Sequence, residues 1–599
     1  MYIYDIVPLT AIPRPNPQVL SYYCAKKLNK FTLVEIPLGK KFYPGILLGG
    51  RQVKDLKSVL RKAYFQVKEV KRVLYHGPIL FDWQFTLAKW ITDYYWSSLG
   101  LVLKKFIPRY LYQVSSIEYR VLEKGRKEQI LWLFPDNSFF QKVELPLGFI
   151  RISSRLTDKK EFQIFKKIAS EKERIIIGTK RALFAPYNTL REIHIFEEAD
   201  QSHKSWEQHP KYNAVRVAQE LAKLHGAKVI YRSTLPSLER YYKTHGYYQS
   251  DESYSSKLRN VNISSIDLTK EKLKKPFSGK VEQALKDSYL GGKQAILYVN
   301  RRGEGRFLLC RDCSFVPKCP HCELSLVFHT NIYDKRILLC HHCGYKEAPP
   351  SLCSQCGSHE IRSYGFGTQR VEKELLSLFP KAKVFRLDSD TARGDSAKQD
   401  IVEQFRLGGN FLVATSMLFQ TSIEPVCMTA SLNADSELNI PDFAQTERLF
   451  FNLWRLRYFA RDLFYIQTYN PANPVFEHIM KNDWQGFYKK ELEARKMLNY
   501  PPFSSIIKLT FTHRNESRAR EESEVLYKKL QRQAVNCQLS IVNCQFLGPA
   551  PAFLAKLKGK YRYNILLKLK ANEDRKLKAN LLLTVPPSWD VDIDPIDSL

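Results

Sequence analysis

Eight of the twelve cysteines in this sequence lie within one short stretch, as four Cys-x-x-Cys pairs. The pairs are Cys310 with Cys313, Cys319 with Cys322, Cys340 with Cys343, and Cys353 with Cys356. The tight turn inside such a pair aims two thiolates at one ion, and four thiolates complete the tetrahedral coordination that Zn²⁺ prefers. The eight sulfurs therefore predict two bound Zn²⁺ ions. Four thiolates leave no open position for a reacting water, so both sites are expected to be structural.

The spacing of the pairs also suggests which sulfurs share an ion. The first two pairs are separated only by the segment SFVPK, which makes it difficult for both to reach the same ion. We therefore expect interleaved sites, in which the outer pairs (310, 313, 353 and 356) hold one ion and the inner pairs (319, 322, 340 and 343) hold the other. The alternative is that His321, His341 or His342 replaces one of the cysteine ligands.

A second stretch with possible chemistry is IHIFEEADQ, residues 193–201. In many nucleotide-hydrolysing proteins an apolar strand ends in an Asp that helps to hold Mg²⁺, and the next Glu polarises the attacking water. Here Phe196 stands at the position of that Asp, and Glu197 and Glu198 follow it. The stretch is therefore either a hydrolytic site or what remains of one.

Charge indicates the class of partner. Lys and Arg (93) exceed Asp and Glu (61) by 32, which gives a pI near 9.5 and favours a polyanionic partner such as nucleic acid. No window reaches the roughly 18 apolar residues of a membrane span, and the N-terminus lacks a basic stretch followed by an apolar run. We expect a cytoplasmic protein without a membrane partner. In that reducing compartment, paired cysteines are metal ligands before they are disulfides.

The elements that must position these residues follow an alternating pattern of strands and helices. Apolar runs such as QILWLF, RIIIGTK, EIHIF and KVIYR predict one parallel sheet, and QAILYV, KVFRL, NFLVAT and LFYIQT predict a second. Two α/β lobes in a strongly basic chain suggest a nucleic-acid motor, with the cysteine module inserted in the second lobe.

At this level of detail the sequence resembles the PriA family of replication-restart helicases. The resemblance rests on IIIGTKRALFAPY, FEEAD, RSTLPSLE, YVNRRG, the eight-cysteine module, GFGTQRVEKEL, FRLDSDT, YPPF, LGPAPA and DVDIDP, in family order over nearly the whole chain. It implies an α/β multidomain protein with a small β-barrel-like N-terminal DNA-binding domain, two RecA-like helicase lobes, zinc knuckles inserted in lobe 2, and a C-terminal α/β domain. The implied boundaries are 1–108, a connector at 109–127, lobe 1 at 128–275, lobe 2 at 276–309 and 357–472, the two-zinc module at 310–356, and the C-terminal domain at 473–599.

The resemblance also implies where DNA is bound. Lys40 and Lys41, which follow Gly39, match a loop of the domain that recognises the 3′ end of a nascent strand in the family. Near the C-terminus, a run of cations is interleaved with tyrosines, a mixture suited to phosphates and stacked bases. Its residues are Lys556, Lys558, Lys560, Tyr561 and Arg562.

This chain departs from the family at the ATP site. It has no GxxxxGK[ST] phosphate loop, and the connector is too short for the loop and the winged-helix domain that the family carries there. The family motif GTxxxxKG becomes ATSMLFQT, with Ala414, Gln420 and Thr421 at the altered places. The motif ending GRAGR becomes RYFARD, with Phe459 and Asp462 on the two arginine positions. A shifted register could let Arg457 or Arg461 replace one of those arginines.

We therefore interpret IHIFEEAD as the remnant of a hydrolytic motif, in which Phe196 extends the packing of the sheet. We expect Glu197 and Glu198 to be solvated or Arg-paired charges, not catalysts, and we expect ATP hydrolysis to be lost, while the sequence leaves open whether any ATP and Mg²⁺ binding survives. The predicted function is a DNA-binding protein of replication restart at forked or single-stranded DNA, working with other primosome proteins. Two alternatives remain: an active 3′-to-5′ helicase with a divergent or partner-completed nucleotide site, and a zinc-stabilised primosome scaffold.

Overall fold

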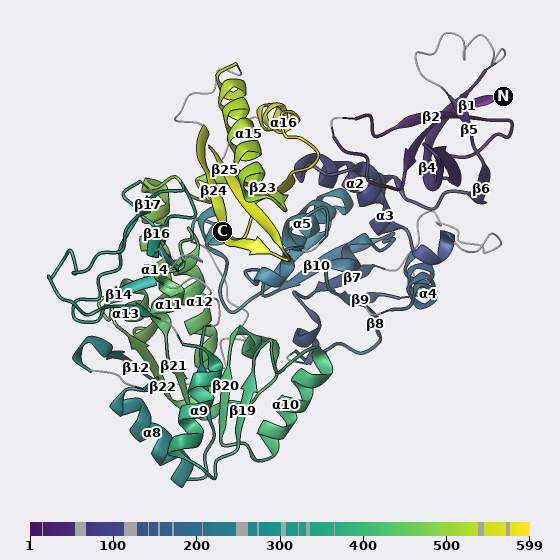
Figure 1. Cartoon of the computed structure of the whole chain (residues 1–599). Coiled ribbons are helices and arrows are strands. Elements are labelled where there is room, and N and C mark those ends of the chain that lie inside the picture. The colour runs from purple at the N-terminus through teal and green to yellow at the C-terminus, as the bar shows by residue number, and fades with distance from the viewer. Residues whose placement is uncertain are drawn as a thin grey trace. The chain divides into compact units, whose positions relative to one another are not determined.

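The structure of the protein is a computed structural model (Figure 1). It describes residues 1–598 except for 15, 54–66, 113–127, 142, 154–155, 171–172, 207, 247–260, 272–274, 301–306, 322, 331–335, 365, 537–543 and 571–574. The chain forms two units. The first comprises Met1–Thr234 and Lys578–Ile593, and the second comprises Leu235–Leu577 and Asp594–Leu599.

The first unit begins with a six-stranded sheet in the order β5-β2-β1-β4-β3-β6. The strands are β1 (Tyr2–Pro8), β2 (Leu20–Cys24), β3 (Leu33–Leu38), β4 (Lys41–Gln52), β5 (Lys68–Glu69) and β6 (Arg72–Tyr75). Its two outer strands belong to one continuous segment, which pairs first with β2 and then with β3. The sheet therefore closes on itself as the predicted small barrel, around a core that includes Ile6, Val34, Ile36 and Leu47.

A helical segment connects this barrel to the next domain. It contains α2 (Asp82–Tyr94) and α3 (Leu99–Phe106), both with buried apolar faces. The indole of Trp83 on α2 donates a hydrogen bond of 3.0 Å to the carbonyl of Tyr187, which lies in the following domain.

The second domain of this unit is a five-stranded parallel sheet in the order β11-β10-β7-β9-β8. Its strands are β7 (Gln129–Leu133), β8 (Phe149–Ile152), β9 (Ile175–Gly178), β10 (Leu190–Phe196) and β11 (Lys228–Arg232). The helices α4 (Asp158–Ala169) and α5 (Ala214–His225) supply the crossovers. This confirms the first predicted α/β lobe. No described strand pairs with β11 on its outer side.

The end of the chain returns to the first unit. It contributes α16 (Arg575–Leu583) and β26 (Asp590–Ile593). Lys204, only 1% exposed, pairs with Asp592 at 2.8 Å and donates to the carbonyl of Ile593 at 2.7 Å. A buried ammonium is tolerated only with such partners, so this pair holds the C-terminal segment to lobe 1.

The second unit is built on a six-stranded parallel sheet in the order β12-β22-β21-β13-β20-β19. Its strands are β12 (Asn262–Asp267), β13 (Ala295–Tyr298), β19 (Val384–Leu387), β20 (Phe411–Ala414), β21 (Val426–Ser431) and β22 (Ala460–Thr468). The surrounding helices are α6 (Leu238–Lys243), α8 (Gly279–Leu290), α9 (Thr368–Leu378), α10 (Asp395–Gly408), α11 (Ala434–Leu438), α12 (Gln445–Leu456) and α13 (Pro474–Met480). Separate apolar cores form on the two faces of the sheet, as the second predicted lobe requires.

Between β13 and α9 the chain leaves this sheet to form the cysteine module. The module contains a two-stranded sheet of β14 (Phe307–Cys310) and β18 (Ile361–Tyr364) and a three-stranded sheet of β15 (Val327–Thr330), β16 (Arg336–Leu339) and β17 (Lys346–Glu347). The insertion in lobe 2 that the sequence predicted is confirmed.

The remainder of this unit is the C-terminal α/β domain. After α14 (Trp484–Met497), the antiparallel strands β23 (Ser504–His513), β24 (Cys544–Leu557) and β25 (Lys560–Lys570) lie side by side in the order β24-β25-β23. The long helix α15 (Glu516–Asn536) lies along this sheet (Figure 1). Among the described helices, none is both long enough and apolar enough to cross a bilayer.

Candidate functional site

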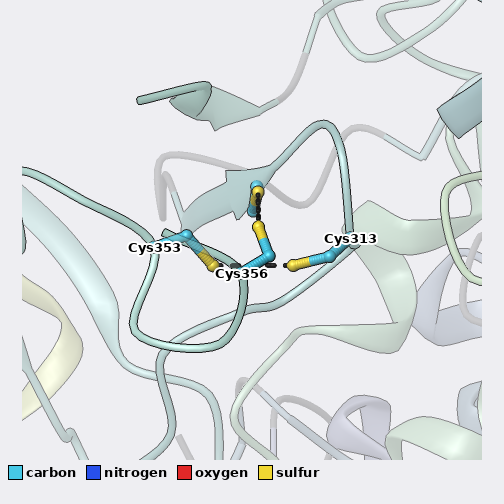
Figure 2. A group of neighbouring side chains, drawn as sticks. Cys313, Cys353 and Cys356 are labelled. Carbon is cyan, nitrogen blue, oxygen red and sulfur yellow. Dashed lines mark hydrogen bonds between the residues drawn. The ribbon is translucent and has the colours of Figure 1, made fainter. Parts of the chain in front are cut away.

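The outer cysteines of the module form a compact group. Sγ of Cys310 lies 3.7 Å from Sγ of Cys356, Sγ of Cys313 lies 3.5 Å from Sγ of Cys353, and the four sulfurs all lie within 4.8 Å of one another. Figure 2 shows the labelled members of this group with their sulfurs turned toward one another. With Zn–S bonds of about 2.3 Å, a tetrahedron places its sulfurs about 3.8 Å apart, whereas a disulfide places them about 2.05 Å apart. The group fits a tetrahedral metal ion.

The inner cysteines form a second group. It contains Cys319, Cys340 and Cys343, whose sulfurs also lie within 4.8 Å of one another, with 3.5 Å between Cys319 and Cys343. Cys322, the predicted fourth ligand, lies outside the described residues. The first Cys-x-x-Cys pair therefore lies beside the fourth, and Cys319 of the second pair lies beside the third, as the interleaved arrangement requires.

The same backbone turn occurs at all four pairs and explains the grouping. The amide four residues after the first cysteine donates to that cysteine's carbonyl, and the first cysteine's amide donates to the carbonyl five residues on. The residue that directly follows the second cysteine has a positive φ each time: Ser314 (65°), Glu323 (58°), Gly344 (82°) and Gly357 (72°). Where both cysteines of a pair are described, such a turn brings their two thiols together, so that they can share one metal ion.

The histidines near the module are engaged elsewhere. His341 shares a hydrogen bond of 2.9 Å with His329 through Nε2, and its Nδ1 lies 3.0 Å from the carbonyl oxygen of Pro551. The ring of His321 packs edge-on against Tyr345, and that of His342 against Tyr500. Among the described residues, the groups of possible metal ligands contain only cysteines of the module, which favours all-cysteine sites.

The IHIFEEAD segment lies at the carboxyl end of β10 (Leu190–Phe196). Phe196 is 1% exposed and stacks on Phe134, with 4.2 Å between ring centroids and 12° between planes. Trp132 and Phe140 complete what we call the aromatic cluster (Trp132, Phe134, Phe140 and Phe196). The expectation that Phe196 extends the packing of the sheet is confirmed.

The two glutamates after Phe196 are buried, which excludes the solvated half of the expectation. Glu197 and Glu198 are 4% and 9% exposed, so they are not solvated charges. The carboxylate of Glu197 accepts from the amide and the hydroxyl of Thr234, at 3.1 and 3.2 Å, and the amide of Glu198 donates to Ser233 Oγ at 3.0 Å. Glu197 also has a φ of 44°, a left-handed conformation that is unfavourable for its side chain. Together these contacts join the end of β10 to the loop after β11, a role that strand patterning alone does not reveal.

The residues at the altered motif positions of lobe 2 also make contacts within the fold. Gln420, at the place of the family's lysine, accepts a hydrogen bond of 2.8 Å from Lys398, and the hydroxyl of Thr421 donates to the carbonyl of Leu418 at 2.7 Å. Ala414 is buried in β20, and Phe459 is buried with its ring 6.4 Å from that of Phe419.

The arginines proposed as substitutes have other partners. Arg457 is buried, hydrogen-bonds Asn482 and lies over the ring of Trp454. Arg461 donates to the carbonyl of Pro425 at 2.9 Å, and Asp462 is exposed on β22. Arg455, which the sequence reading did not single out, lies over the Phe419 ring at 4.4 Å.

The predicted DNA contacts lie on exposed turns. Lys40 and Lys41 are exposed at the turn between β3 and β4, where Gly39 adopts the positive φ of 61° that a tight reversal needs. The exposed ammonium groups can reach a phosphate without the loss of any described salt bridge.

The C-terminal cations occupy the tip of the β24–β25 hairpin. Its two-residue turn, Lys558 and Gly559, has φ values of 49° and 76°, the type I′ geometry that favours Gly at the second position. Lys556 lies 4.9 Å from the centroid of the Tyr561 ring across the hairpin, with Lys560 at the start of β25 and Arg562 one residue further. The tip presents cations beside an aromatic ring on one exposed element.

Comparison with known proteins identifies two of these regions. The 3′DNA-binding domain (3′BD) model matches residues 10–108, and the Primosomal protein N C-terminal domain model matches residues 496–596. A solved DUF1998 helicase, MrfA bound to DNA and AMPPNP, is 10% identical with a TM-score of 0.32, covering 61% of this chain and 44% of that one. A likeness at that level carries no argument here.

Similar sequences extend over the whole chain. The replication restart protein PriA of Rickettsia prowazekii (strain Madrid E) is 32% identical over 596 residues, which cover 96% of this chain and 87% of that protein. The replication restart protein PriA of Bacillus subtilis (strain 168) is 33% identical over 434 residues, covering 70% of this chain but 52% of that protein. The chain spans about half to two thirds of the length of several such relatives.

The barrel, the two lobes, the inserted cysteine module and the C-terminal domain occur in the order that the motifs indicated, and the comparisons confirm that resemblance. Because it is 32% identical to the Rickettsia prowazekii protein and covers 87% of that protein, this chain belongs to the PriA family of replication restart proteins.

Proposed function

We propose that this protein is a DNA-binding member of the PriA family that acts in replication restart at forked or single-stranded DNA and does not hydrolyse ATP. The observation that carries the proposal is Phe196. At the place of the Mg²⁺-associated carboxylate of hydrolysing motors it puts a buried ring, 4.2 Å from that of Phe134. The absence of a GxxxxGK[ST] segment from the sequence supports the same conclusion.

DNA binding, in this proposal, uses surfaces other than that site. The domain matched by the 3′DNA-binding domain model carries Lys40 and Lys41, and the hairpin tip at Lys556–Arg562 belongs to the region matched by the C-terminal domain model. The formal charge of +32 adds a sequence-independent attraction to phosphates. Neither surface requires a bound nucleotide, so we expect binding without ATP.

The metal sites are proposed to hold two Zn²⁺ ions that cross-link the module. The outer ion would be held by Cys310, Cys313, Cys353 and Cys356, and the inner ion by Cys319, Cys322, Cys340 and Cys343. Zinc bound to four thiolates supplies structural rigidity. The boundaries inferred from the resemblance, with the module at 310–356 and the C-terminal domain at 473–599, are proposed as the functional layout.

Hydrolysis is tested with purified protein, forked DNA and Mg²⁺-ATP. We expect no DNA-stimulated turnover, and Glu197→Gln should behave like the wild type. The amide side chain can still accept from the Thr234 amide and contact its hydroxyl, so this variant should fold. Turnover in the wild type that Glu197→Gln abolishes would show an active motor and reject the proposal.

Binding is tested by the salt dependence of affinity. Each phosphate neutralised should contribute a slope of about −0.7 on single strands, or about −0.9 on duplex, in log affinity against log salt. Replacing three hairpin lysines by alanine should make the slope shallower, and Tyr561→Ala should weaken single-strand binding by ~1 to 3 kcal/mol with little change in slope. The lysines are Lys556, Lys558 and Lys560. Binding that needs ATP would favour the helicase alternative, and negligible DNA affinity together with capture of primosome proteins would favour the scaffold.

A further inference from the structure

The parallel sheet of lobe 1 has two faces that differ in cover. One face carries Ile193, Leu131 and Ile176, each 0% exposed. Both helices of the lobe lie against this face, because Gln129 donates to the carbonyl of Ile168 on α4 at 2.9 Å, and Gln219 on α5 donates to Tyr231 at 2.8 Å. We call this the covered face.

In each strand, the residues that alternate with those of the covered face point to the other side of the sheet, which we call the open face. The strand register places them in two rows. The first row is Lys228, Glu192, Ile130, Ile175 and Phe149, and the second is Ile230, His194, Trp132, Ile177 and Arg151. Phe149 is 37% exposed, and Trp132, Ile130, Ile175 and Ile230 are half-buried. Among the described residues, the segment that carries Phe139, Phe140, Val143 and Leu145 packs over part of this face. Ile177 and His194 are buried, while Phe149 and Lys228 remain exposed.

The chemistry of the open face combines rings and cations. Lys228 and Arg232 lie on β11 at one margin, and Arg151 lies on β8 at the other. The ring of Trp132 lies between them on β7, and Phe149 lies on β8 beside Arg151. Within the five strands, Glu192 is the one carboxylate on this face, and it is engaged with His194 at 2.9 Å. The face is therefore apolar and aromatic in the middle and positively charged at both margins.

Several of these groups are held in place by their neighbours. His194 stacks on Trp132 at 5.5 Å and accepts from Arg232 Nε at 2.9 Å, and the Arg151 guanidinium lies over the Phe140 ring at 4.0 Å. Burial lowers the pKa of His194, which keeps its Nδ1 available to accept from Arg232 at neutral pH. Side chains fixed in this way lose little entropy when a ligand binds.

We propose that the open face of lobe 1 is a platform for single-stranded DNA, on which bases stack against Trp132 and Phe149 while Lys228, Arg232 and Arg151 contact phosphates. Neighbouring strands are about 4.8 Å apart and two residues along a strand span about 6.6 Å, so Trp132 and Phe149, two strands and one row apart, are separated by about 12 Å, which leaves room for successive bases. Single strands expose the base faces that such stacking needs, and duplex DNA does not. The inference rests on the proposed DNA-binding function and adds a third surface to it.

The proposal is tested on the full chain with Phe149→Ala combined with Lys228→Ala. Both side chains are exposed, so the fold should survive, which thermal unfolding can check. The matched control is Leu290→Ala with Lys223→Ala, because Leu290 is 83% exposed at the end of α8, Lys223 lies on α5, and neither belongs to the sheet of lobe 1. We expect the test variant to bind an oligo(dT) single strand at least about fivefold more weakly, with duplex binding unchanged, while the control binds like the wild type.

The position of the strand is read directly by photo-cross-linking with an oligonucleotide that contains 5-iododeoxyuridine. Cross-links in peptides that contain Trp132 or Phe149 would support the platform. Cross-links confined to residues 10–108 and 496–596, with unchanged affinity of the test variant, would overturn it and leave the proposed function intact. A wild type that binds no DNA would overturn both. The platform would also be overturned if the test variant kept its DNA affinity but no longer bound a helical protein that the wild type captures, because the open face would then bind protein.

Discussion

Replacing Phe196 tests most directly whether lobe 1 has exchanged a hydrolytic site for a packed core. Phe196→Ala removes a side chain that is 1% exposed and stacked on Phe134 at 4.2 Å. A cavity of this kind costs about 3–5 kcal/mol. Phe196→Asp, which introduces the carboxylate expected in a hydrolysing motor, loses the same packing and buries a charge in the aromatic cluster, at a further cost of several kcal/mol. Because a domain is stable by only about 5–15 kcal/mol, this variant should unfold lobe 1.

Hydrogen exchange followed by mass spectrometry suits this measurement, because a multidomain chain does not unfold in one transition. Peptides from β7 and β10 should lose protection strongly in Phe196→Asp and Phe196→Ala, and those from the N-terminal barrel should keep it. Phe196→Leu retains most of the apolar volume and should cost only about 1–2 kcal/mol. The reasoning is wrong if Phe196→Asp is as well protected as the wild type and acquires Mg²⁺-dependent binding of ATP.

Three other outcomes can be checked separately. Cys310→Ser and Cys319→Ser should each lower the zinc content, measured by elemental analysis, from two ions per chain to one, and loss of both ions from either variant would contradict independent sites. Lys204→Met leaves the buried carboxylate of Asp592 unpaired and should destabilise the first unit by about 3–5 kcal/mol in the same exchange experiment, whereas unchanged protection would show that the pair is dispensable. Burial raises the pKa of Asp435 from 3.8 to about 6, so its stabilising protonation is complete below pH 4 and is lost as the pH rises through 6. Relative to Asp435→Asn, the wild type should therefore lose up to roughly 3 kcal/mol of unfolding free energy over that range, and parallel pH profiles would argue against the shift.

The sequence was sufficient for the features that depend on local signals. Two of the four Cys-x-x-Cys pairs are followed by a glycine, Gly344 or Gly357, which accepts a positive φ readily, and the turn that results is a property of a few adjacent residues. The alternating strands of both lobes were predictable for the same reason, because buried strands are short apolar runs.

Features that depend on distant neighbours could not be predicted. Glu197 was expected to be solvated or Arg-paired; its carboxylate is in fact buried against the loop at Thr234, and nothing near Glu197 in the sequence indicates that contact. The open face of lobe 1 was missed because Trp132 and Phe149 look like ordinary core residues. Their exposure depends on which helices are present to cover them, and that is a property of the whole sheet.

The pairing of β14 with β18 affects how this chain can gain or lose segments during evolution. Cys310 lies opposite Ile361 and Phe307 opposite Tyr364, so the chain enters and leaves the cysteine module at neighbouring points. A segment whose ends already meet imposes little closure entropy on its host, whatever its length. The module can therefore lengthen, shorten or be transplanted as one exchangeable part, and lobe 2 can retain its sheet when the module is replaced by a short turn between those two strands.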